Sequence, residues 1–360
     1  MMAATNSEAT VVQAEGSQDS VKSQAQLAQN EELLHACAVG DLDDIGQLIK
    51  AGAESFYQRD SDGKSCLMAA AENGHLDAVQ LLLQEGAPWN AVDRSARCAG
   101  EYAVSEGYQD IVDALVDAGV RAELLFYRMH VNSPPPAPKY LNKPVRYQGD
   151  DLLDEEDRGV MMLWEKPLMD VHAQLMCQTH GDVLNVGFGL GLIDTAIQSH
   201  LPRTHTIIEA HPGVLAKMRK DGWMDKPNVR VVEGRWQDVL EQLGTFDAIF
   251  FDTFDDVLYM QEFHQVLPRL LRPDGLYSFF NGICTENVFF QGVACQVVKL
   301  QLEELGFDTE FHTIEVDSGD DATWKDVAFR YFSGSAYYLP MITWHQDTAA
   351  DQPTASAERQ

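Results

Sequence analysis

The chain has 360 residues, which is long for one compact core and typical of two domains. Its 56 Asp and Glu residues outnumber 26 Lys and Arg, and the net charge of −30 repels nucleic-acid phosphates and favours basic protein partners. No apolar stretch reaches the roughly 18 to 20 residues of a membrane span, the amino terminus shows no secretory-signal pattern, and six scattered cysteines form no C-x-x-C pair. We therefore expect a soluble intracellular protein without nucleic acid, membrane or metal among its ligands.

Both ends of the chain and one internal segment have the composition of non-globular sequence. Residues 1–28 are rich in Ser, Gln, Ala and Glu and contain no aromatic residue, which predicts disorder, and residues 346–360 have a similar composition. The run NSPPPAPKYLNKP holds five of the fourteen prolines, as is typical of an extended linker. We place this proline-rich linker at residues 126–146, between domains at 29–125 and 147–345.

The first domain shows an internal repeat that two sets of glycines mark. The glycines recur at a period of about 33 residues, a period typical of ankyrin repeats, and are Gly40, Gly74 and Gly107 in one set and Gly52, Gly86 and Gly119 in the other. Each copy has room for two short helices and a turn, and the middle copy, residues 62–93, closely resembles an ankyrin repeat, with degenerate copies on either side. We expect an all-α stack that either binds a protein partner or only stabilises the rest of the chain.

The second domain alternates apolar strand-like runs with helical stretches. The predicted strands lie at 182–189, 204–210, 228–234, 246–252 and 275–282, followed by a long amphipathic stretch from about 286 to 306 and β-like runs near 308–316 and 326–332. This order predicts an α/β fold with an open parallel sheet and helices on both faces. Ligands of such sheets bind beyond the carboxyl ends of the strands.

A glycine-rich turn follows the first of these strands and indicates a nucleoside site. Gly187, Gly189 and Gly191 let the backbone turn tightly and come close to a ligand. Glu209 ends the next strand, where a carboxylate can accept hydrogen bonds from ribose hydroxyls. The third glycine comes one residue early for a dinucleotide fingerprint. Trp236 and Gln237 follow the third strand, where a ring and a polar side chain can hold an adenine.

In order and spacing these motifs resemble the class I S-adenosylmethionine-dependent methyltransferases, whose fold is Rossmann-like. Two further segments, VMMLWEKPLM at 160–169 and FDTFD at 251–255, are similar to guanidinoacetate N-methyltransferase. An ankyrin block ahead of such a domain is the arrangement of the fungal type IV protein arginine methyltransferases, the arginine N5-methyltransferases. The resemblance covers roughly residues 30–340.

The resemblance implies catalytic and substrate-binding roles for Glu165 and Asp252. An arginine guanidinium stays protonated at neutral pH, so a catalyst must hold it, localise its charge and accept a proton as the methyl group arrives. Taken singly, Glu165 would be an ordinary helix-surface charge and Asp252 a turn residue. The matching motifs on both sides favour the catalytic interpretation.

The implied cofactor is S-adenosyl-L-methionine, and no metal is expected. Met169 fits core filling as well as cofactor contact, and Gln237 stands where the simpler enzyme has an acid, so Asp238 is an alternative adenine contact. The implied cofactor-binding residues are Tyr147, Met161, Met169, Gly187, Phe188, Gly189, Leu190, Gly191, Leu192, Glu209, Ala210, His211, Trp236, Gln237 and Asp252.

The resemblance further implies an enzyme of the cytoplasm and nucleus that methylates the δ (N5) nitrogen of arginine in a basic protein. By family resemblance this substrate is a ribosomal protein, and the ankyrin repeats supply protein contacts. Two alternatives stay open at this point: a small-molecule guanidino N-methyltransferase, and an ankyrin adaptor whose methyltransferase domain is inactive. The sequence by itself does not decide which guanidinium nitrogen receives the methyl group.

Overall fold

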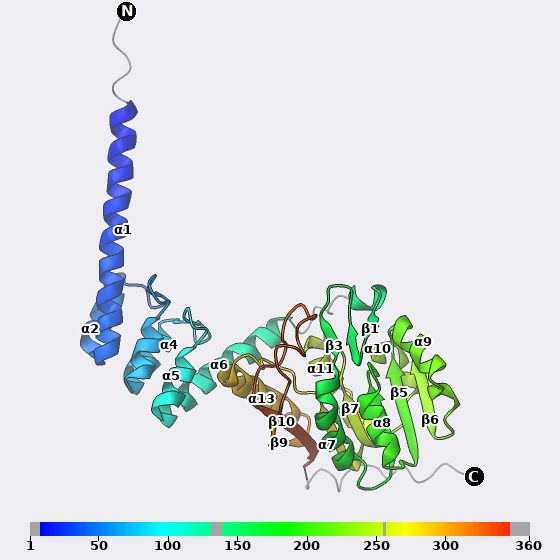
Figure 1. Cartoon of the computed structure of the whole chain (residues 1–360). Helices are drawn as coiled ribbons and strands as arrows, with labels where there is room; N and C mark the ends of the chain where they lie inside the picture. The colour runs from blue at the N-terminus through cyan, green and yellow to red at the C-terminus, as the bar shows by residue number, and fades with distance from the viewer. Residues whose placement is uncertain (1–7, 131–138, 255–256, 346–360) are drawn as a thin grey trace, which may run out of the picture. The chain divides into compact units, whose positions relative to one another are not determined.

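The computed structural model describes residues 8–130, 139–254 and 257–345 (Figure 1). These residues form two compact units, one of residues 8–130 with 287–293 and the other of residues 139–286 with 294–345. The boundary between the two units after His130 falls inside the predicted linker. Residues 131–138 of this linker and the predicted tail 346–360 lie outside the described residues. The predicted domain limits stay predictions.

The first unit is an all-α stack, as the glycine spacing predicts. Gly40, Gly74 and Gly107 take left-handed backbone with φ of +80°, +76° and +78°, each just before a new helix. Short bridges Gln58–Ser65 and Val92–Cys98 form the turns between helix pairs. The helices are α1 (Glu8–Val39), α2 (Leu42–Lys50), α3 (Cys66–Glu72), α4 (Leu76–Gln84), α5 (Ala99–Glu106) and α6 (Gln109–His130).

The structure differs from the sequence prediction at both ends of this unit. Helix α1 begins at Glu8, so most of the segment predicted to be disordered is helical. Its Ala, Gln and Glu residues are good helix formers. The prediction of disorder considered only that this polar segment cannot bury a core, and did not consider helix propensity. At the other end, Gly119 lies inside α6 rather than at a turn, and the helix continues to His130 through the first residues of the predicted linker.

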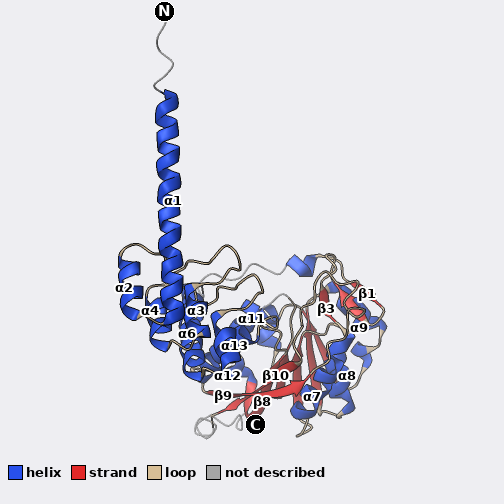
Figure 2. Cartoon of the chain, turned by 60° about the vertical axis from the view of Figure 1, so that its left-hand side comes forward, coloured by secondary structure: helices blue, strands red, loops and turns tan. Residues whose placement is uncertain are grey.

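The second unit is built on a seven-stranded sheet in the order β6-β5-β4-β7-β8-β10-β9. Figure 2 draws the strands of this unit in red, with helices packed around them. Strands β4 to β8 run parallel, which confirms the predicted parallel sheet, whereas β10 is antiparallel to both β8 and β9. The strands are β4 (Asp182–Val186), β5 (Thr204–Glu209), β6 (Val229–Glu233), β7 (Phe246–Phe251), β8 (Leu271–Phe279), β9 (Phe307–Glu315) and β10 (Ala336–Trp344).

The last strand corrects one element of the prediction. The run near 326–332 is a loop, and the final strand begins at Ala336. Phe332 in that run and Trp324 just before it are buried against other aromatic rings, so the apolar pattern reflects loop packing and not strand pairing. The predicted run at 308–316 is confirmed as β9 and the amphipathic stretch as α13.

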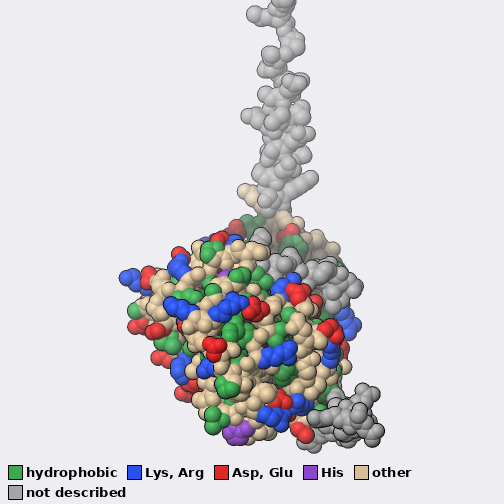
Figure 3. Space-filling model, turned by 90° about the vertical axis from the view of Figure 1, so that its right-hand side faces the viewer, with side chains coloured by type: hydrophobic (Ala, Val, Ile, Leu, Met, Phe, Trp, Pro, Cys, Tyr) green, Lys and Arg blue, Asp and Glu red, His purple; other side chains and the backbone are tan. Residues whose placement is uncertain are grey.

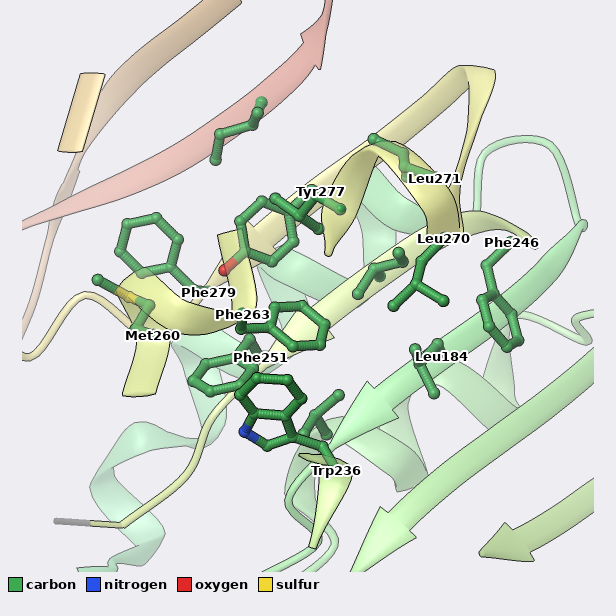
Figure 4. Packing of buried hydrophobic residues seen from close by; sticks show 14 of the residues in the cluster. Leu184, Trp236, Phe246, Phe251, Met260, Phe263, Leu270, Leu271, Tyr277 and Phe279 are labelled. Atoms are coloured by element: carbon green, nitrogen blue, oxygen red, sulfur yellow. The ribbon is translucent and has the colours of Figure 1, made fainter. Parts of the chain in front are cut away.

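Helices cover both faces of the sheet because its strands alternate their buried side chains. Val183 and Phe250 point to one face, where they pack with α7 and α8. Leu184 and Phe251 point to the other and pack with α10 to α13 (Figure 4). The helices of this unit, with α13 belonging to it from residue 294 onward, are α7 (Lys166–Met176), α8 (Leu192–Ser199), α9 (Pro212–Lys220), α10 (Trp236–Val239), α11 (Val257–His264), α12 (Leu267–Leu270) and α13 (Val288–Glu303).

Smaller elements complete the unit. An antiparallel sheet of β1 (Arg146–Gln148), β2 (Asp151–Leu153) and β3 (Gly159–Met161), which the sequence did not predict, precedes α7. Short 3₁₀ turns are η1 (Lys139–Asn142), η2 (Leu163–Glu165), η3 (Trp223–Asp225) and η4 (Leu240–Gln242). Within the described ranges, no helix has the length and apolarity needed to cross a bilayer.

Basic and acidic side chains are interspersed on the face of the molecule drawn in Figure 3. Surface ion pairs of the second unit include Lys217–Asp221 on α9 and Arg219–Glu233 between α9 and β6. Exposed pairs of this kind contribute about 0–1 kcal/mol each, so they keep the surface polar without deciding the fold.

Candidate active site

A cavity opens beyond the carboxyl ends of β4, β5, β6 and β7, where ligands of such sheets bind. Its lining mixes glycines, apolar side chains and two carboxylates. The lining residues are Tyr140, Leu141, Val160, Met161, Val186, Gly187, Phe188, Gly189, Ile208, Glu209, Ala210, Gly234, Arg235, Trp236, Gln237, Asp252, Thr253 and Phe254. Nine of the predicted site residues are among them.

The glycine turn is shaped by close backbone approach. Gly187 has φ of +98°, and a Cβ there would overlap the carbonyl oxygen of Asp252. The Asp252 N–H donates to Val186 O at 2.9 Å, so the ends of β4 and β7 are held together at this point. Gly191, with φ of +73°, ends the turn and begins α8. A side chain at Gly187 would therefore displace the strand that carries Asp252.

A buried polar group supports this turn from below. Asn185 donates from Nδ2 to Gly187 O at 2.7 Å and to Asp194 Oδ1 at 2.9 Å. Asp194 is fully buried and faces His205 Nε2 at 3.1 Å. Asp194 therefore fixes Asn185, the residue that holds the glycine turn.

Glu209 is held rigidly at the cavity wall. Its Oε2 accepts from Phe188 N–H at 2.9 Å and its Oε1 from His211 N–H at 2.6 Å. The side chain is 7% exposed, and burial raises its pKa although these backbone donors favour the charged form. Each carboxylate oxygen keeps a second lone pair, so Glu209 can accept from ribose hydroxyls as its sequence position predicts.

The third strand end differs from the simple expectation of a stacked adenine. The Trp236 ring packs into the core beneath the cavity, 5.2 Å from the Phe263 ring centroid and 6.5 Å from that of Phe251 (Figure 4). Gln237 lines the cavity and donates from Nε2 to Glu262 Oε2 at 3.3 Å, whereas Asp238 is exposed and is not a described lining residue. Gln237 is thus the better placed of the two for an adenine contact.

The tyrosine that lines the cavity among the described residues is Tyr140 and not the predicted Tyr147. The Tyr140 ring lies 4.7 Å from that of His211 and 4.9 Å from that of Phe254. His211 does not line the cavity, but its Nε2–H donates to Lys143 O at 2.9 Å and so anchors this segment. Tyr147 packs in a neighbouring apolar cluster on the small sheet. An aromatic residue directly after the prolines was the available sequence signal for Tyr140.

The two methionines lie in different surroundings. Met161 lines the cavity and accepts from Leu190 N–H through its sulfur at 3.3 Å. Met169 is fully buried among side chains of α7, α8 and the sheet, as the core-filling alternative predicts. Leu190, Gly191 and Leu192 are not described lining residues, so they form the turn and the start of α8 rather than the wall.

Glu165 and Asp252, the predicted catalytic pair, are electrostatic neighbours. Glu165 is 2% exposed, and its Oε1 accepts from Met162 N–H at 2.9 Å and from the Tyr331 hydroxyl. Asp252 lines the cavity, and its buried Oδ2 has no hydrogen-bond partner among the described residues. Burial raises the pKa of Glu165 and the charge of Asp252 raises it further. Burial followed by the charge of Asp194 raises the pKa of Asp252.

The arrangement suits a nucleoside that carries a positive charge, with a cationic group beside it. Glu209 offers a fixed carboxylate for sugar hydroxyls, the glycine turn leaves space that a Cβ would fill, and Asp252 offers an unpartnered carboxylate oxygen. Among the described residues, no cationic side chain is one of the groups that shift the pKa of Glu165 or of Asp252. A bound cation would therefore complete a pair that the protein leaves open.

The strand order, the antiparallel β10 and the glycine turn define the second unit as a class I, Rossmann-like methyltransferase domain preceded by ankyrin repeats. Residues 137–292 match the guanidinoacetate N-methyltransferase family, and residues 33–124 match ankyrin repeats in three copies. The chain belongs to the protein arginine N-methyltransferase 2 family.

Relatives with that name align over most of both chains. The Emericella nidulans protein is 33% identical, with 86% of this chain and 87% of the relative aligned. The Cryptococcus neoformans protein is 35% identical over 82% of this chain and 90% of its own length. The Saccharomyces cerevisiae protein is 31% identical over 75% and 78%. The predicted family and the two-part architecture are confirmed.

Proposed function

We propose that this chain transfers a methyl group from S-adenosyl-L-methionine to the δ (N5) nitrogen of an arginine residue in a basic protein. The observation that carries the proposal is the pair Glu165 and Asp252: both carboxyl groups are buried, the charge of Asp252 acts on Glu165, and Asp252 lines the cavity at the strand ends. A guanidinium would relieve the repulsion between them and replace the water lost by burial.

The chemistry of the substrate explains why two carboxylates are needed. A guanidinium is protonated at neutral pH and its nitrogens share one delocalised charge, so none of them is a good nucleophile. Glu165 and Asp252 can hold two edges of the fork and draw the positive charge away from the reacting nitrogen. One of the two then accepts the proton which that nitrogen loses as it forms the new N–C bond.

The cavity residues fit the cofactor that such a reaction requires. When bound, S-adenosyl-L-methionine supplies a methyl group activated on a sulfonium. Glu209 would hold its ribose, Gln237 its adenine, and Met161 with the glycine turn would enclose the methionine portion. Asp252 lines the same cavity and therefore connects the cofactor side to the substrate side.

The choice of nitrogen and of substrate rests on the resemblance to the fungal type IV protein arginine methyltransferases. A protein substrate is supported by the names of the relatives, by an ankyrin unit of a kind that usually binds proteins, and by a net charge of −30 that attracts basic chains. A ribosomal protein meets the requirement for a basic partner. A cytoplasmic and nuclear location stays a prediction.

One experiment tests the proposal directly. The full-length protein is incubated with methyl-labelled S-adenosyl-L-methionine and either purified basic ribosomal proteins or a small-molecule extract, with Glu165→Gln as the matched inactive control. Labelled protein is hydrolysed to amino acids and the methylarginine isomer is identified by chromatography and mass spectrometry. We expect δ-N-methylarginine in protein and none with the control variant.

Each other outcome contradicts a defined part of the proposal. Label on a terminal guanidinium nitrogen would contradict the δ position while keeping arginine as the substrate. Label confined to a small guanidino compound would favour the small-molecule alternative. A folded protein that binds the cofactor and labels nothing would favour the inactive adaptor.

A further inference from the structure

The loop of residues 316–335 between β9 and β10 reaches the catalytic pair from a distant part of the chain. Its Tyr331 donates its hydroxyl hydrogen bond to Glu165, 166 residues earlier in the sequence. Neither residue type nor spacing marks Tyr331 as functional, and the three-dimensional contact is the first indication of a role.

The loop that carries Tyr331 is fixed by its own hydrogen bonds. Arg330 donates to Ser318 Oγ at 2.7 Å and to Gly319 O at 3.0 Å, and Trp324 Nε1 donates to Ser318 O at 2.9 Å. The main-chain oxygen of Tyr331 accepts from Thr285 Oγ1 at 2.5 Å. These bonds fix the backbone that carries Tyr331, through the side chain of Arg330 and through the main-chain oxygen of Tyr331 itself.

The Tyr331 ring also sits in a close aromatic environment. Its centroid lies 4.9 Å from that of Trp324 in an edge-to-face arrangement and 5.8 Å from that of Trp164. On another side, a Cβ at Gly159 would lie 2.6 Å from Tyr331 Cε1, so the glycine makes room for the ring. The hydroxyl position is therefore set by packing and needs no ordering when a substrate arrives.

The two donors to Glu165 reach the same carboxylate oxygen. Met162 N–H and the Tyr331 hydroxyl both bind Oε1, and no hydrogen bond of Oε2 is recorded among the described residues. The N–H of Leu163 donates to Asp151 Oδ1 at 3.0 Å, which fixes the turn that presents Glu165. A carboxylate held through one oxygen offers the other in a fixed direction.

We propose that Tyr331 is a positioning residue for Glu165, whose hydroxyl, together with the Met162 N–H, occupies Oε1 and leaves Oε2 to bind the guanidinium of the substrate arginine. The inference rests on the proposed function, because it assumes that a guanidinium is what Glu165 holds. A second role follows from the same bond: a hydroxyl donor stabilises the carboxylate against the charges of Asp252 and Asp151, the acidic groups that act on Glu165.

Tyr331→Phe tests the proposal because it removes the hydroxyl and keeps the ring. The variant loses one hydrogen bond to a charged group. We therefore expect kcat/KM on an arginine peptide to fall about 10- to 100-fold. Affinity for S-adenosyl-L-methionine should be unchanged by calorimetry. Without the donor the pKa of Glu165 rises further, so the acid limb of the kcat/KM profile should move to higher pH.

Two controls separate positioning from a general structural effect. Tyr277→Phe removes another buried hydroxyl, one without a hydrogen-bond partner in the described structure, and should leave activity and the pH profile unchanged. Adding Tyr331→Phe to Glu165→Gln should change the remaining activity by less than about twofold, because the tyrosine acts through the charge that is already gone.

A readout without methyl transfer keeps the two proposals distinguishable. The Glu165 carboxyl is titrated by ¹³C NMR, with its signal assigned from Glu165→Gln, in wild type and in Tyr331→Phe. A higher pKa in Tyr331→Phe supports the positioning role even if wild type methylates no protein arginine, in which case only the proposed function fails. An unchanged titration, normal kcat/KM in Tyr331→Phe, or lost cofactor affinity in that variant would overturn the inference.

Discussion

Glu165→Gln changes one atom of the catalytic pair and little else. Glutamine keeps an amide oxygen that can accept from Met162 N–H and from Tyr331 as Glu165 Oε1 does. The amide nitrogen replaces Oε2, so the variant loses the negative charge and the free acceptor together. Because the side chain is 2% exposed, water cannot take the place of the missing carboxylate oxygen.

The size of the effect follows from that burial. Removing one charged partner from a desolvated pair costs about 3–5 kcal/mol. Because a tenfold change in rate corresponds to about 1.4 kcal/mol, kcat/KM on a protein arginine substrate should fall by hundreds- to thousands-fold. Affinity for S-adenosyl-L-methionine should survive, since Glu165 is not among the described residues that line the cofactor cavity.

Stability should change in the opposite direction. Burial and the charge of Asp252 raise the pKa of Glu165 above its usual value near 4.5, so the folded chain binds this proton more tightly than the unfolded chain. The group therefore favours folding at low pH and costs stability increasingly as the pH rises from the unfolded toward the folded pKa. The melting temperature of Glu165→Gln minus that of wild type should grow over this interval.

The assay combines three measurements on the same preparations: initial methylation rates with peptide and protein substrates, cofactor affinity by calorimetry, and thermal unfolding at several pH values. Near-normal methyl transfer by Glu165→Gln would refute the role of the charge. If the melting temperature of Glu165→Gln falls by several degrees at neutral pH, Glu165 stabilises the folded chain. That result would contradict the expectation that the buried carboxylate lowers the stability of the fold.

Further predictions follow from the same geometry. Asp252→Asn should reduce kcat/KM at least as much as Glu165→Gln. The double variant should be little less active than the poorer single variant, because the effects of residues that act as a unit are not additive. Fully additive losses would mean that the two carboxylates act on different groups. Gly187→Ala should abolish cofactor binding in calorimetry, because its Cβ would overlap the Asp252 carbonyl. The control Gly222→Ala should bind the cofactor normally, because Gly222 also has a positive φ but its Cβ would meet no atom within 4 Å. Equal losses of affinity in both variants would point to backbone strain alone. With a net charge of −30, KM for a basic protein should rise several-fold between about 0.01 M and about 0.15 M salt, as the screening length falls from about 30 to about 8 Å, and an unchanged KM would exclude electrostatic attraction.

Much of the architecture could be read from local patterns. The regular glycine spacing predicts the ankyrin stack because each repeat is one structural unit with the same turn. The apolar runs predict the parallel strands, and Gly187 and Glu209 predict the nucleoside site, because in such a sheet consecutive strand ends meet at one edge. The pairing of Glu165 with Asp252 came from family motifs, and the structure places them as electrostatic neighbours.

What the sequence left undecided depends on contacts between distant segments. The antiparallel β10, the burial of the Trp236 ring and the choice of Tyr140 over Tyr147 follow from how loops and helices pack on the finished sheet, which local periodicity does not encode. Tyr331 reaches Glu165 only because the β9–β10 loop folds back over the turn before α7. The sequence by itself therefore determined the repeats, the run of parallel strands and the edge of the sheet that holds the site, whereas tertiary packing decided the direction of each side chain there.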